Sequence, residues 1–310
     1  MPASLILAAA LAAQPTPAAG TAEAFVGRWN LRITDAEDTF VSGGIDIRKE
    51  GAGLAAGVVW RWGSYLPAKS VVWKDGLVEI VREERPGRFD VFVVRLEGER
   101  MLGQVSYPDG VVQHFEGRRA PLLLDKRAPV WGEPVTLFDG KSLSGWKLRD
   151  AKKKNGWAAV NGELAVVDTK DNADLVSERA FQDMKLHVEW NVDAKSNSGV
   201  YLRGRYEIQI LDNPDAKMAL DPHGCGALYS RVAPKLDATK PAGEWQTYDI
   251  TLVGRQLQVV LNGKQIVNTV VEGITGGALD PFEGEPGPLM LQGDHGKVRF
   301  RNIVVTPAIR

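Results

Sequence analysis

The sequence predicts an all-β protein of two domains, a small antiparallel barrel or sandwich followed by a larger jelly-roll β-sandwich. Its 310 residues are enough for about two domains. From residue 25 onward, short alternating apolar runs are separated by tight turns, and no stretch carries a helical stripe of useful length. The 33 glycines exceed the usual share of about 7%, as many tight turns between short strands would require.

Composition and charge exclude several classes of protein. A hydrophobic content of 44% and a charged content of 25% are typical of a folded chain rather than a disordered one. With 38 basic and 39 acidic residues the net charge is −1, so the basic footprint of a nucleic-acid-binding protein is missing. The single cysteine, Cys225, excludes a disulfide within the chain and any zinc or iron–sulfur site built from cysteines.

Residues 1–20 are predicted to be a signal peptide and linker. Residues 4–13 are uncharged and rich in Leu and Ala, but they are too few to span a bilayer. A small-x-small pattern at 10–12 resembles a cleavage site, and residues 14–20 are rich in Pro and Ala. The segment before the apolar run has no Lys or Arg, so a disordered Ala-rich tail is the alternative. A signal peptide implies a periplasmic or secreted protein, and no later stretch is apolar enough for a membrane helix.

A first all-β domain is predicted for residues 24–120. The turns at 74–76 and 108–110 contain Asp-Gly, in which Gly supplies a positive φ angle. Residues 27–29 read Gly-Arg-Trp and resemble the Gly-x-Trp at the start of lipocalin-like barrels. The expected strands are residues 41–48, 57–62, 70–73, 77–81, 89–96, 101–106 and 111–118.

A linker over residues 121–134, in a stretch with three prolines and no periodicity, separates a second domain at 135–310. Asn-Gly pairs at 161–162 and 262–263 predict two hairpins. These strands are too many for one open sheet, so they predict two sheets packed face to face. The expected strands are residues 157–160, 163–166, 184–191, 199–203, 206–212, 246–253, 257–261, 265–271, 289–292 and 298–305.

Two of these strands place a glutamate on the face opposite their apolar residues. Alternation puts Glu189 on one such face and Glu207 with Gln209 on the other. If the two strands are neighbours, the two carboxylates converge; the alternative is a pair of solvated surface glutamates. Short polar residues such as Asn197, the cation of Arg203 and several aromatic residues lie nearby in the sequence. This mixture is typical of a carbohydrate-binding face, because hydroxyls need hydrogen-bond partners and sugar rings pack on aromatic ones.

Two histidines in glycine-containing turns, His223 and His295, are further candidates for chemistry. Each could equally be a turn histidine that bonds to the backbone. Together with Glu189 and Glu207 they could bind a divalent metal ion, although no helical HExxH spacing exists. No phosphate-binding loop, dinucleotide fingerprint or Gly-x-Ser-x-Gly elbow occurs, so no other cofactor is indicated.

A series of motifs in the second domain follows one order. They are Leu-Phe-Asp-Gly-Lys-Ser-Leu-Ser-Gly-Trp at 137–146, Glu-Trp at 189–190, and the segments 197–203, 206–212, 226–229, 243–245, 261–263, 291–296 and 300–303. In this combination they resemble the 3-keto-disaccharide hydrolase family, formerly a domain of unknown function. The resemblance covers roughly residues 135–306 and implies a concanavalin A-like lectin/glucanase sandwich.

The resemblance implies an enzyme that cleaves the glycosidic bond of 3-keto-glycosides. A separate dehydrogenase would first oxidise the sugar at C3; removal of the C2 proton and β-elimination would then release the aglycone, and water addition would complete a net hydrolysis. Under this reading Glu207 or His295 is the base, and Glu189 is a partner carboxylate or metal ligand. A metal ion or a cationic donor would stabilise the enolate. The side chains expected to hold the sugar are Asn197, Arg203, Gln209, Tyr229, Trp245 and Gln292.

Two other functions remain open at this point. An ordinary glycosidase needs two suitably spaced carboxylates, but Gln209 occupies the middle position of the pattern Glu207-x-Gln209-x-x-Asp212. A lectin-like module would bind a sugar and turn nothing over. The sequence also leaves open whether the first domain covers the cleft, drives oligomerisation or anchors a partner.

Overall fold

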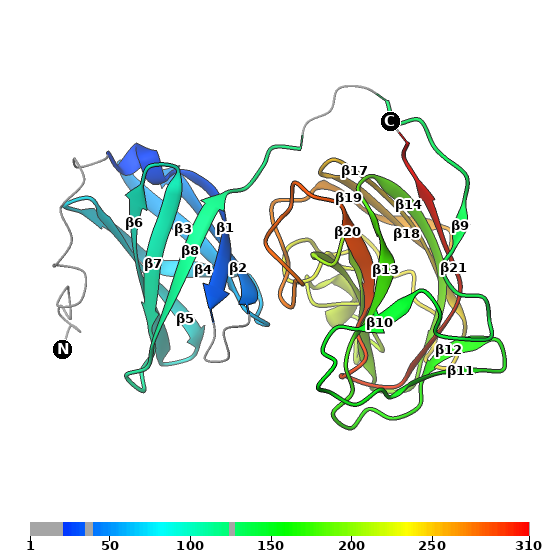
Figure 1. The fold of residues 1–310 in the computed structure, drawn as a ribbon. Helices are drawn as coiled ribbons and strands as arrows, with labels where there is room; N and C mark the ends of the chain where they lie inside the picture. Colours follow the sequence, from blue (N-terminus) through cyan, green and yellow to red (C-terminus); the bar gives the residue numbers. More distant parts are fainter. Residues whose placement is uncertain (1–20, 35–39, 124–127, 310) are drawn as a thin grey trace.

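The computed structural model describes residues 21–34, 40–123 and 128–309. The predicted signal peptide and linker at 1–20 lie outside these residues. Figure 1 shows two β-rich bodies side by side. The all-β prediction is confirmed: the only helices in the described part of the chain are the short 3-10 turns η1 (Ala22–Phe25) and η2 (Met218–Leu220).

The first body is a closed antiparallel barrel in which each strand pairs with the next and β8 pairs back with β1. Its core contains Trp29, Ile45, Val58, Phe92 and other apolar residues that face inward. The barrel alternative of the sequence prediction is therefore the correct one. The strands are β1 (Gly27–Thr34), β2 (Phe40–Glu50), β3 (Gly53–Trp60), β4 (Leu66–Lys74), β5 (Leu77–Arg85), β6 (Arg88–Glu97), β7 (Arg100–Ser106) and β8 (Val112–Arg119).

The sequence analysis placed the end of one barrel strand too late. The run at 57–62 was expected to be extended throughout, but β3 ends at Trp60. Arg61 has φ of 56°, in the left-handed region, so the chain turns there. As a result Trp62 leaves the barrel wall and is 56% exposed.

The second body is a sandwich of two sheets. One has five strands in the order β10-β13-β20-β15-β16, and the other has the order β11-β12-β21-β14-β17-β18-β19 with β9 also paired to β21. The strands are β9 (Val135–Thr136), β10 (Trp146–Leu148), β11 (Trp157–Val160), β12 (Glu163–Val166), β13 (Leu175–Phe181), β14 (Met184–Val192), β15 (Asn197–Leu202), β16 (Tyr206–Leu211), β17 (Gln246–Val253), β18 (Gln256–Leu261), β19 (Lys264–Val270), β20 (Gly287–Leu291) and β21 (Val298–Pro307).

The core of the sandwich lies between the two sheets and confirms the predicted architecture. Leu186, Val188 and Trp190 of β14 enter it from one sheet, and Ile208 and Ile210 of β16 enter it from the other. Their alternate neighbours face outward, as the period-two pattern predicted. Both Asn-Gly hairpins form, joining β11 to β12 and β18 to β19. β13 was not predicted, because Ser-Glu-Arg in its middle breaks the apolar alternation.

The barrel touches the sandwich through side chains and through one turn. Asn30 donates to the Pro281 carbonyl (3.0 Å), and Arg231 pairs with Asp46 (3.3 Å). In the turn between β3 and β4, the Arg61 carbonyl accepts from the Gly277 N–H at 3.0 Å. The barrel end that carries this turn is thus fixed against the sandwich.

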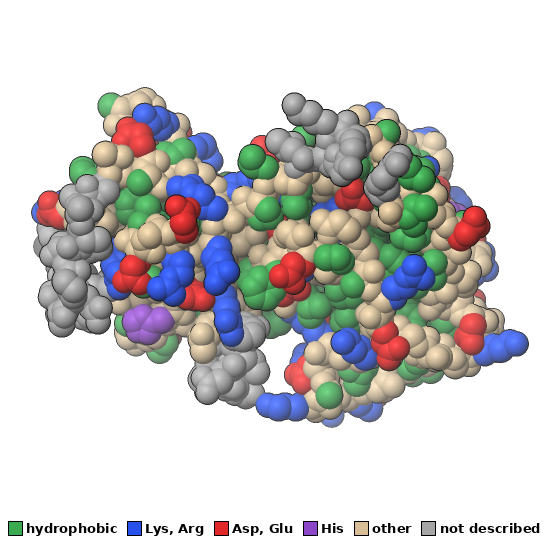
Figure 2. Space-filling view, turned by 45° about the horizontal axis from the view of Figure 1, so that its top comes forward, with side chains coloured by type: hydrophobic (Ala, Val, Ile, Leu, Met, Phe, Trp, Pro, Cys, Tyr) green, Lys and Arg blue, Asp and Glu red, His purple; other side chains and the backbone are tan. Residues whose placement is uncertain are grey.

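The surface in Figure 2 shows acidic and basic side chains interspersed over both bodies. This distribution agrees with the net charge of −1. In the described part of the chain, no helix has the length and apolar character to cross a membrane.

Candidate active site

The candidate site is a cavity of about 100 Å³ on the outer face of the five-stranded sheet, beside β15 and β16. Glu207 and Gln209 reach it because they alternate along β16 with the core residues Ile208 and Ile210. We call it the Glu207 cavity. Its walls are formed by Trp62, Arg149, Asp174, Asn197, Tyr201, Glu207, Gln209, Tyr229, Gly276, Gly277, Gln292, Asp294 and His295.

Glu207 is the most strongly perturbed acid in this cavity. It is only 3% exposed, and it lies opposite Tyr201 on the neighbouring strand. Its carboxyl group fills the space above Gly199, where an added Cβ would come 2.3 Å from Oε1. Burial raises the pKa of Glu207 to about 8, although Tyr201 and His295 act in the opposite direction. Near neutral pH this carboxyl group can therefore both accept and hold a proton.

His295 and Asp294 form a hydrogen-bonded pair in the wall of the cavity. Nδ1 of the imidazole hydrogen-bonds to Asp294 Oδ1. This hydrogen bond raises the pKa of His295 despite partial burial, and the charge of Glu207 acts in the same direction. Burial opposes ionisation of Asp294, but the bond to His295 lowers the pKa of that carboxyl overall. Since Nδ1 is engaged, Nε2 is the nitrogen available to a substrate.

Arg149 and Asp174 form another part of the cavity wall. The Arg149 Nη1 donates to the Gly277 carbonyl at 2.7 Å and lies 3.3 Å from Asp174 Oδ2. Burial raises the pKa of Asp174, and Arg149 partly offsets this. The guanidinium also stacks on the Trp62 ring, 4.6 Å from its centroid. These contacts of Arg149 and Asp174 hold this part of the cavity wall in place.

Three buried amide oxygens in the cavity have no hydrogen-bond partner among the residues that the structure describes. They belong to Asn197, Gln209 and Gln292. A buried polar atom without a partner is costly, by about 1–3 kcal/mol, so several at one cavity indicate groups reserved for a ligand. Amide oxygens accept hydrogen bonds from hydroxyl groups, which a sugar carries on every side.

The structure brings together most of the residues that the sequence analysis selected. Those that line the Glu207 cavity are Glu207, His295, Asn197, Gln209, Tyr229 and Gln292. Four others lie elsewhere: Glu189, Arg203, His223 and Trp245 are not part of its walls.

The expectation that Glu189 converges with Glu207 is wrong. Glu189 is on β14, and this strand belongs to the other sheet. Its carboxylate accepts from Arg301 Nε at 2.7 Å and from Asn302 Nδ2 at 2.6 Å. Burial opposes ionisation, but these bonds lower the pKa of Glu189 overall. Glu189 ties β14 to β21 and does not line the site.

Arg203 and Trp245 also have structural partners instead of the expected sugar. Arg203 is fully buried in the β15–β16 turn, where Nη2 donates to Asp183 at 2.8 Å and Nε donates to the Gln182 carbonyl. The Trp245 ring lies beneath the Arg301 guanidinium at 3.9 Å. The sequence analysis selected both residues because a cationic and an aromatic side chain suit a sugar. In the structure both side chains contact other residues of the protein instead.

The metal set expected from the sequence does not assemble. His223 hydrogen-bonds to Asp221 and to Ser64 of the barrel, at 2.8 and 3.0 Å, behind Tyr229. Within residues 21–34, 40–123 and 128–309, no three His, Cys, Asp or Glu side chains are placed to hold a metal ion.

Sequence reasoning missed Trp62, Arg149 and Asp174. They come from the β3–β4 turn, the end of β10 and the residue before β13. None of the three belongs to a recognisable catalytic or binding motif. Trp62 also lies in the first domain, whereas the rest of the site lies in the second. An Arg-Asp pair across 25 positions carries no local signal.

Comparisons with known proteins concern the family of the second domain. Residues 133–306 match the family model described as the 3-keto-alpha-glucoside-1,2-lyase-like domain. A 3-keto-disaccharide hydrolase of Bacteroides thetaiotaomicron is 27% identical over 190 residues, 49% of this chain; the match spans 66% of that protein, just under two thirds.

Two solved structures of proteins from Parabacteroides distasonis, assigned as glycosyl hydrolases, are each 25% identical to this chain. Their TM-scores are 0.48 and 0.45, and the matches cover 59% and 57% of this chain and 93% and 100% of theirs. Because the family model covers more than half of the sequence, this chain belongs to the 3-keto-alpha-glucoside-1,2-lyase-like family.

Proposed function

We propose that this protein cleaves the glycosidic bond of 3-keto-glycosides by abstracting the C2 proton. The observation that carries the proposal is the buried Glu207 carboxyl, with its pKa raised to about 8, inside a cavity of unpartnered amide oxygens. Family membership supports the class of substrate. The 3-keto group has to be introduced beforehand by a separate sugar dehydrogenase.

The first step uses Glu207 as the base. A ketone at C3 acidifies the C2–H bond, because the electron pair left on C2 delocalises onto the C3 oxygen. The Glu207 carboxylate takes this proton and becomes a carboxylic acid. A base with a pKa near the operating pH is suited to this transfer, since a useful fraction is ionised and the ionised form is strongly basic.

The second step expels the leaving group. The enolate electrons re-form the C3 ketone and a C1–C2 double bond, and the C1–O bond breaks. His295, whose pKa is raised by Asp294, donates a proton to the departing glycosidic oxygen. Water then adds at C1 and returns its proton to His295, C2 regains the proton from Glu207, and the net result is hydrolysis.

The amide side chains hold the sugar for these steps. Asn197, Gln209 and Gln292 each present an acceptor to a hydroxyl, which fixes the ring so that C2–H faces Glu207. Tyr229 offers an aromatic wall. In these steps the chain's own residues supply the base, the acid and the hydroxyl acceptors.

The test is a cleavage assay on a 3-keto-glucoside and on its unoxidised parent, each with and without EDTA. Glu207→Gln keeps the size of the side chain and removes the base, so turnover should fall at least about a thousandfold. Glu189→Gln is the matched control, since this glutamate lies outside the cavity and should leave turnover near the wild-type rate.

Each outcome is decisive. Release from the keto sugar alone, lost in the Glu207 variant, supports the proposal. Release from the parent sugar would indicate an ordinary glycosidase. Binding without release from either substrate would indicate a lectin-like module. Loss with EDTA and rescue by a divalent ion would show that a metal takes part.

A further inference from the structure

We propose that the barrel domain holds the leaving group of the substrate, with Trp62 as the platform between the two sugar units. This inference rests on the proposed function, because it divides the same substrate into a reacting unit and a leaving unit. It assigns a role in catalysis to a domain that the family match does not include.

The Glu207 cavity is too small for a whole disaccharide. Its volume of about 100 Å³ lies well below the range of about 300–1,000 Å³ that is usual for ligand sites. It can admit the reacting part of the keto sugar. The remainder of the substrate must therefore lie outside the cavity. Trp62 lines the cavity and is also exposed, so we take it as part of the cavity rim.

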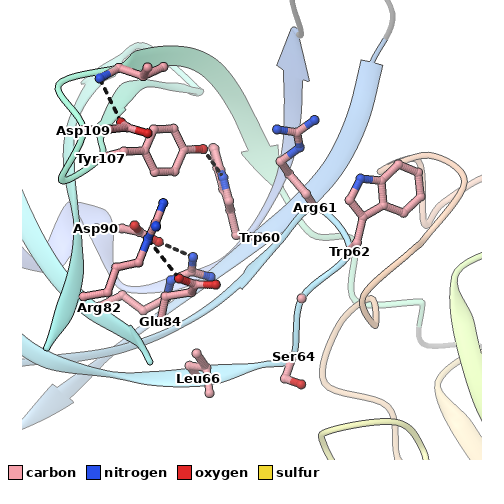
Figure 3. Close-up of a pocket in the computed structure, with 13 residues that line it drawn as sticks. Trp60, Arg61, Trp62, Ser64, Leu66, Arg82, Glu84, Asp90, Tyr107 and Asp109 are labelled. Atoms are coloured by element: carbon pink, nitrogen blue, oxygen red, sulfur yellow. Dashed lines mark hydrogen bonds and ion pairs between the residues drawn. The ribbon is translucent and has the colours of Figure 1, made fainter. Parts of the chain in front are cut away.

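A second, larger cavity also has Trp62 in its wall. Its volume is about 620 Å³, and it lies at the barrel end formed by the β3–β4, β5–β6 and β7–β8 connections (Figure 3). We call it the barrel cavity; its walls include Trp60, Arg61, Trp62, Arg82, Asp90 and Tyr107. Of the residues that line the two cavities, Trp62 is the one they share.

The turn that carries Trp62 is fixed to the sandwich on both sides of the ring. Before it, the Arg61 carbonyl accepts from the Gly277 N–H at 3.0 Å. After it, the Ser64 hydroxyl hydrogen-bonds to His223 at 3.0 Å. The turn also packs so tightly on Gly276 that an added Cβ would lie 2.3 Å from the Gly63 carbonyl oxygen. A fixed turn with an exposed ring is a preorganised binding element.

The Trp62 ring is both held and available. The Arg149 guanidinium stacks on it at 4.6 Å from the centroid, which restrains the ring beside the Glu207 cavity. Even so, the residue is 56% exposed. An exposed aromatic ring held by a charged neighbour at a cavity rim is suited to pack against the C–H face of a sugar.

The barrel cavity has the polarity of a site for a neutral polyhydroxyl group. Three arginines, 61, 82 and 88, are balanced there by three acids, 84, 90 and 109, so no anionic ligand is favoured. The buried Nε atoms of Arg61 and Arg82 have no hydrogen-bond partner within the described residues. The Tyr107 hydroxyl accepts from Trp60 Nε1 at 2.7 Å and donates to Gln113 Oε1 at 3.0 Å, so its oxygen can add only an acceptor. These groups would meet hydroxyls of the leaving sugar.

The experiment compares two substrates that differ only in the leaving group: methyl 3-keto-glucoside and a 3-keto-disaccharide of glucose. Trp62→Ala should lower kcat/KM for the disaccharide about tenfold or more, mainly through KM, and should lower it clearly less for the methyl glucoside, which lacks the leaving sugar that the ring would hold. Leu66→Trp, which fills the barrel cavity, should show the same selectivity. Trp73→Ala, on the exposed barrel surface outside both cavities, is the matched control.

Equal losses on both substrates in Trp62→Ala would show that the ring only supports the Glu207 cavity and would overturn the proposal. No loss on either substrate would overturn it too. A Leu66→Trp variant that cleaves the disaccharide at the wild-type rate would overturn the placement of the leaving unit in the barrel cavity.

A binding measurement separates this proposal from the proposed function. If the wild-type protein cleaves neither keto substrate, the proposed function fails. Titration calorimetry with the unoxidised disaccharide then still tests Trp62. About tenfold weaker binding in Trp62→Ala, with wild-type affinity in Trp73→Ala, supports the platform, and unchanged affinity in Trp62→Ala overturns it.

Discussion

Glu207→Gln should abolish turnover and at the same time stabilise the folded protein at neutral and alkaline pH. The carboxyl has a pKa of about 8 when folded, against 4.5 as its ordinary value, so the folded chain binds this proton more tightly than the unfolded chain. Stability from this group is fully present below about pH 4.5 and is lost as the pH rises toward 8. Glutamine does not ionise, so the variant does not suffer this loss.

The size of the effect follows from the two pKa values. Proton linkage gives a wild-type loss of about 1 kcal/mol at pH 5, about 3 kcal/mol at pH 7 and about 4 kcal/mol at pH 8. For a domain of this size, about 4 kcal/mol corresponds to roughly 10 °C in melting temperature. The variant should therefore melt close to the wild type at pH 4.5 and clearly above it at pH 8.

Differential scanning calorimetry of the two proteins from pH 4.5 to 8.5 measures this. Only the difference between them is interpreted, since groups remote from Glu207 titrate alike in both. Among the neighbouring groups, His295 loses the contribution of the Glu207 charge to its pKa in the variant. The transition that includes the sandwich is the relevant one, because Glu207 lies on β16.

A difference in melting temperature that does not change with pH would refute this reasoning. It would show that the Glu207 carboxyl is not a buried acid kept protonated by its surroundings. A gap that widens as the pH falls would show that the carboxyl is stabilised in its ionised form, and the base assignment would then need another residue. Loss of activity without any gain in stability at pH 8 would count against the burial argument alone.

Three further outcomes follow from the same contacts. With a carboxylate base of pKa about 8, log kcat/KM should rise by about one per pH unit from pH 6 upward, until His295 loses the proton that it donates; a profile that is flat or falls from pH 6 upward contradicts this. Gly199→Ala places a methyl group against Glu207 Oε1, so steady-state kinetics should show roughly a hundredfold loss while circular dichroism stays native. Arg203→Met leaves Asp183 without its buried partner, so urea unfolding should show a loss of about 3 kcal/mol with KM unchanged.

Local patterns were sufficient to predict the strands and one face of the site. Alternation along β16 separates Glu207 and Gln209 from Ile208 and Ile210 without reference to any other part of the chain. The Asn-Gly turns fixed two hairpins, because Asn161 and Asn262 take the left-handed conformation that such turns require. Patterns of this kind involve only a few neighbouring residues, so they can be recognised without knowledge of tertiary contacts.

Strand order could not be obtained in this way. Glu189 and Glu207 have equivalent surroundings in their own strands, yet β14 and β16 belong to different sheets. Arg203 resembles a sugar-binding cation in sequence, but a left-handed backbone at the β15–β16 turn directs it to Asp183. Which polar residue becomes a ligand and which becomes a structural partner is decided by pairing between distant segments.

The position of Trp62 shows the same limit at the level of domains. Its own sequence context predicts a strand residue, and the turn at Arg61 reverses that assignment through one backbone angle. The turn then meets Gly276 and Gly277, more than two hundred residues later, where the lack of side chains allows close approach. A site completed by such a contact depends on both domains folding and docking. Substitutions that loosen the docking, such as Asp46→Ala opposite Arg231, should therefore weaken disaccharide cleavage more than methyl glucoside cleavage, because only the larger substrate needs the barrel.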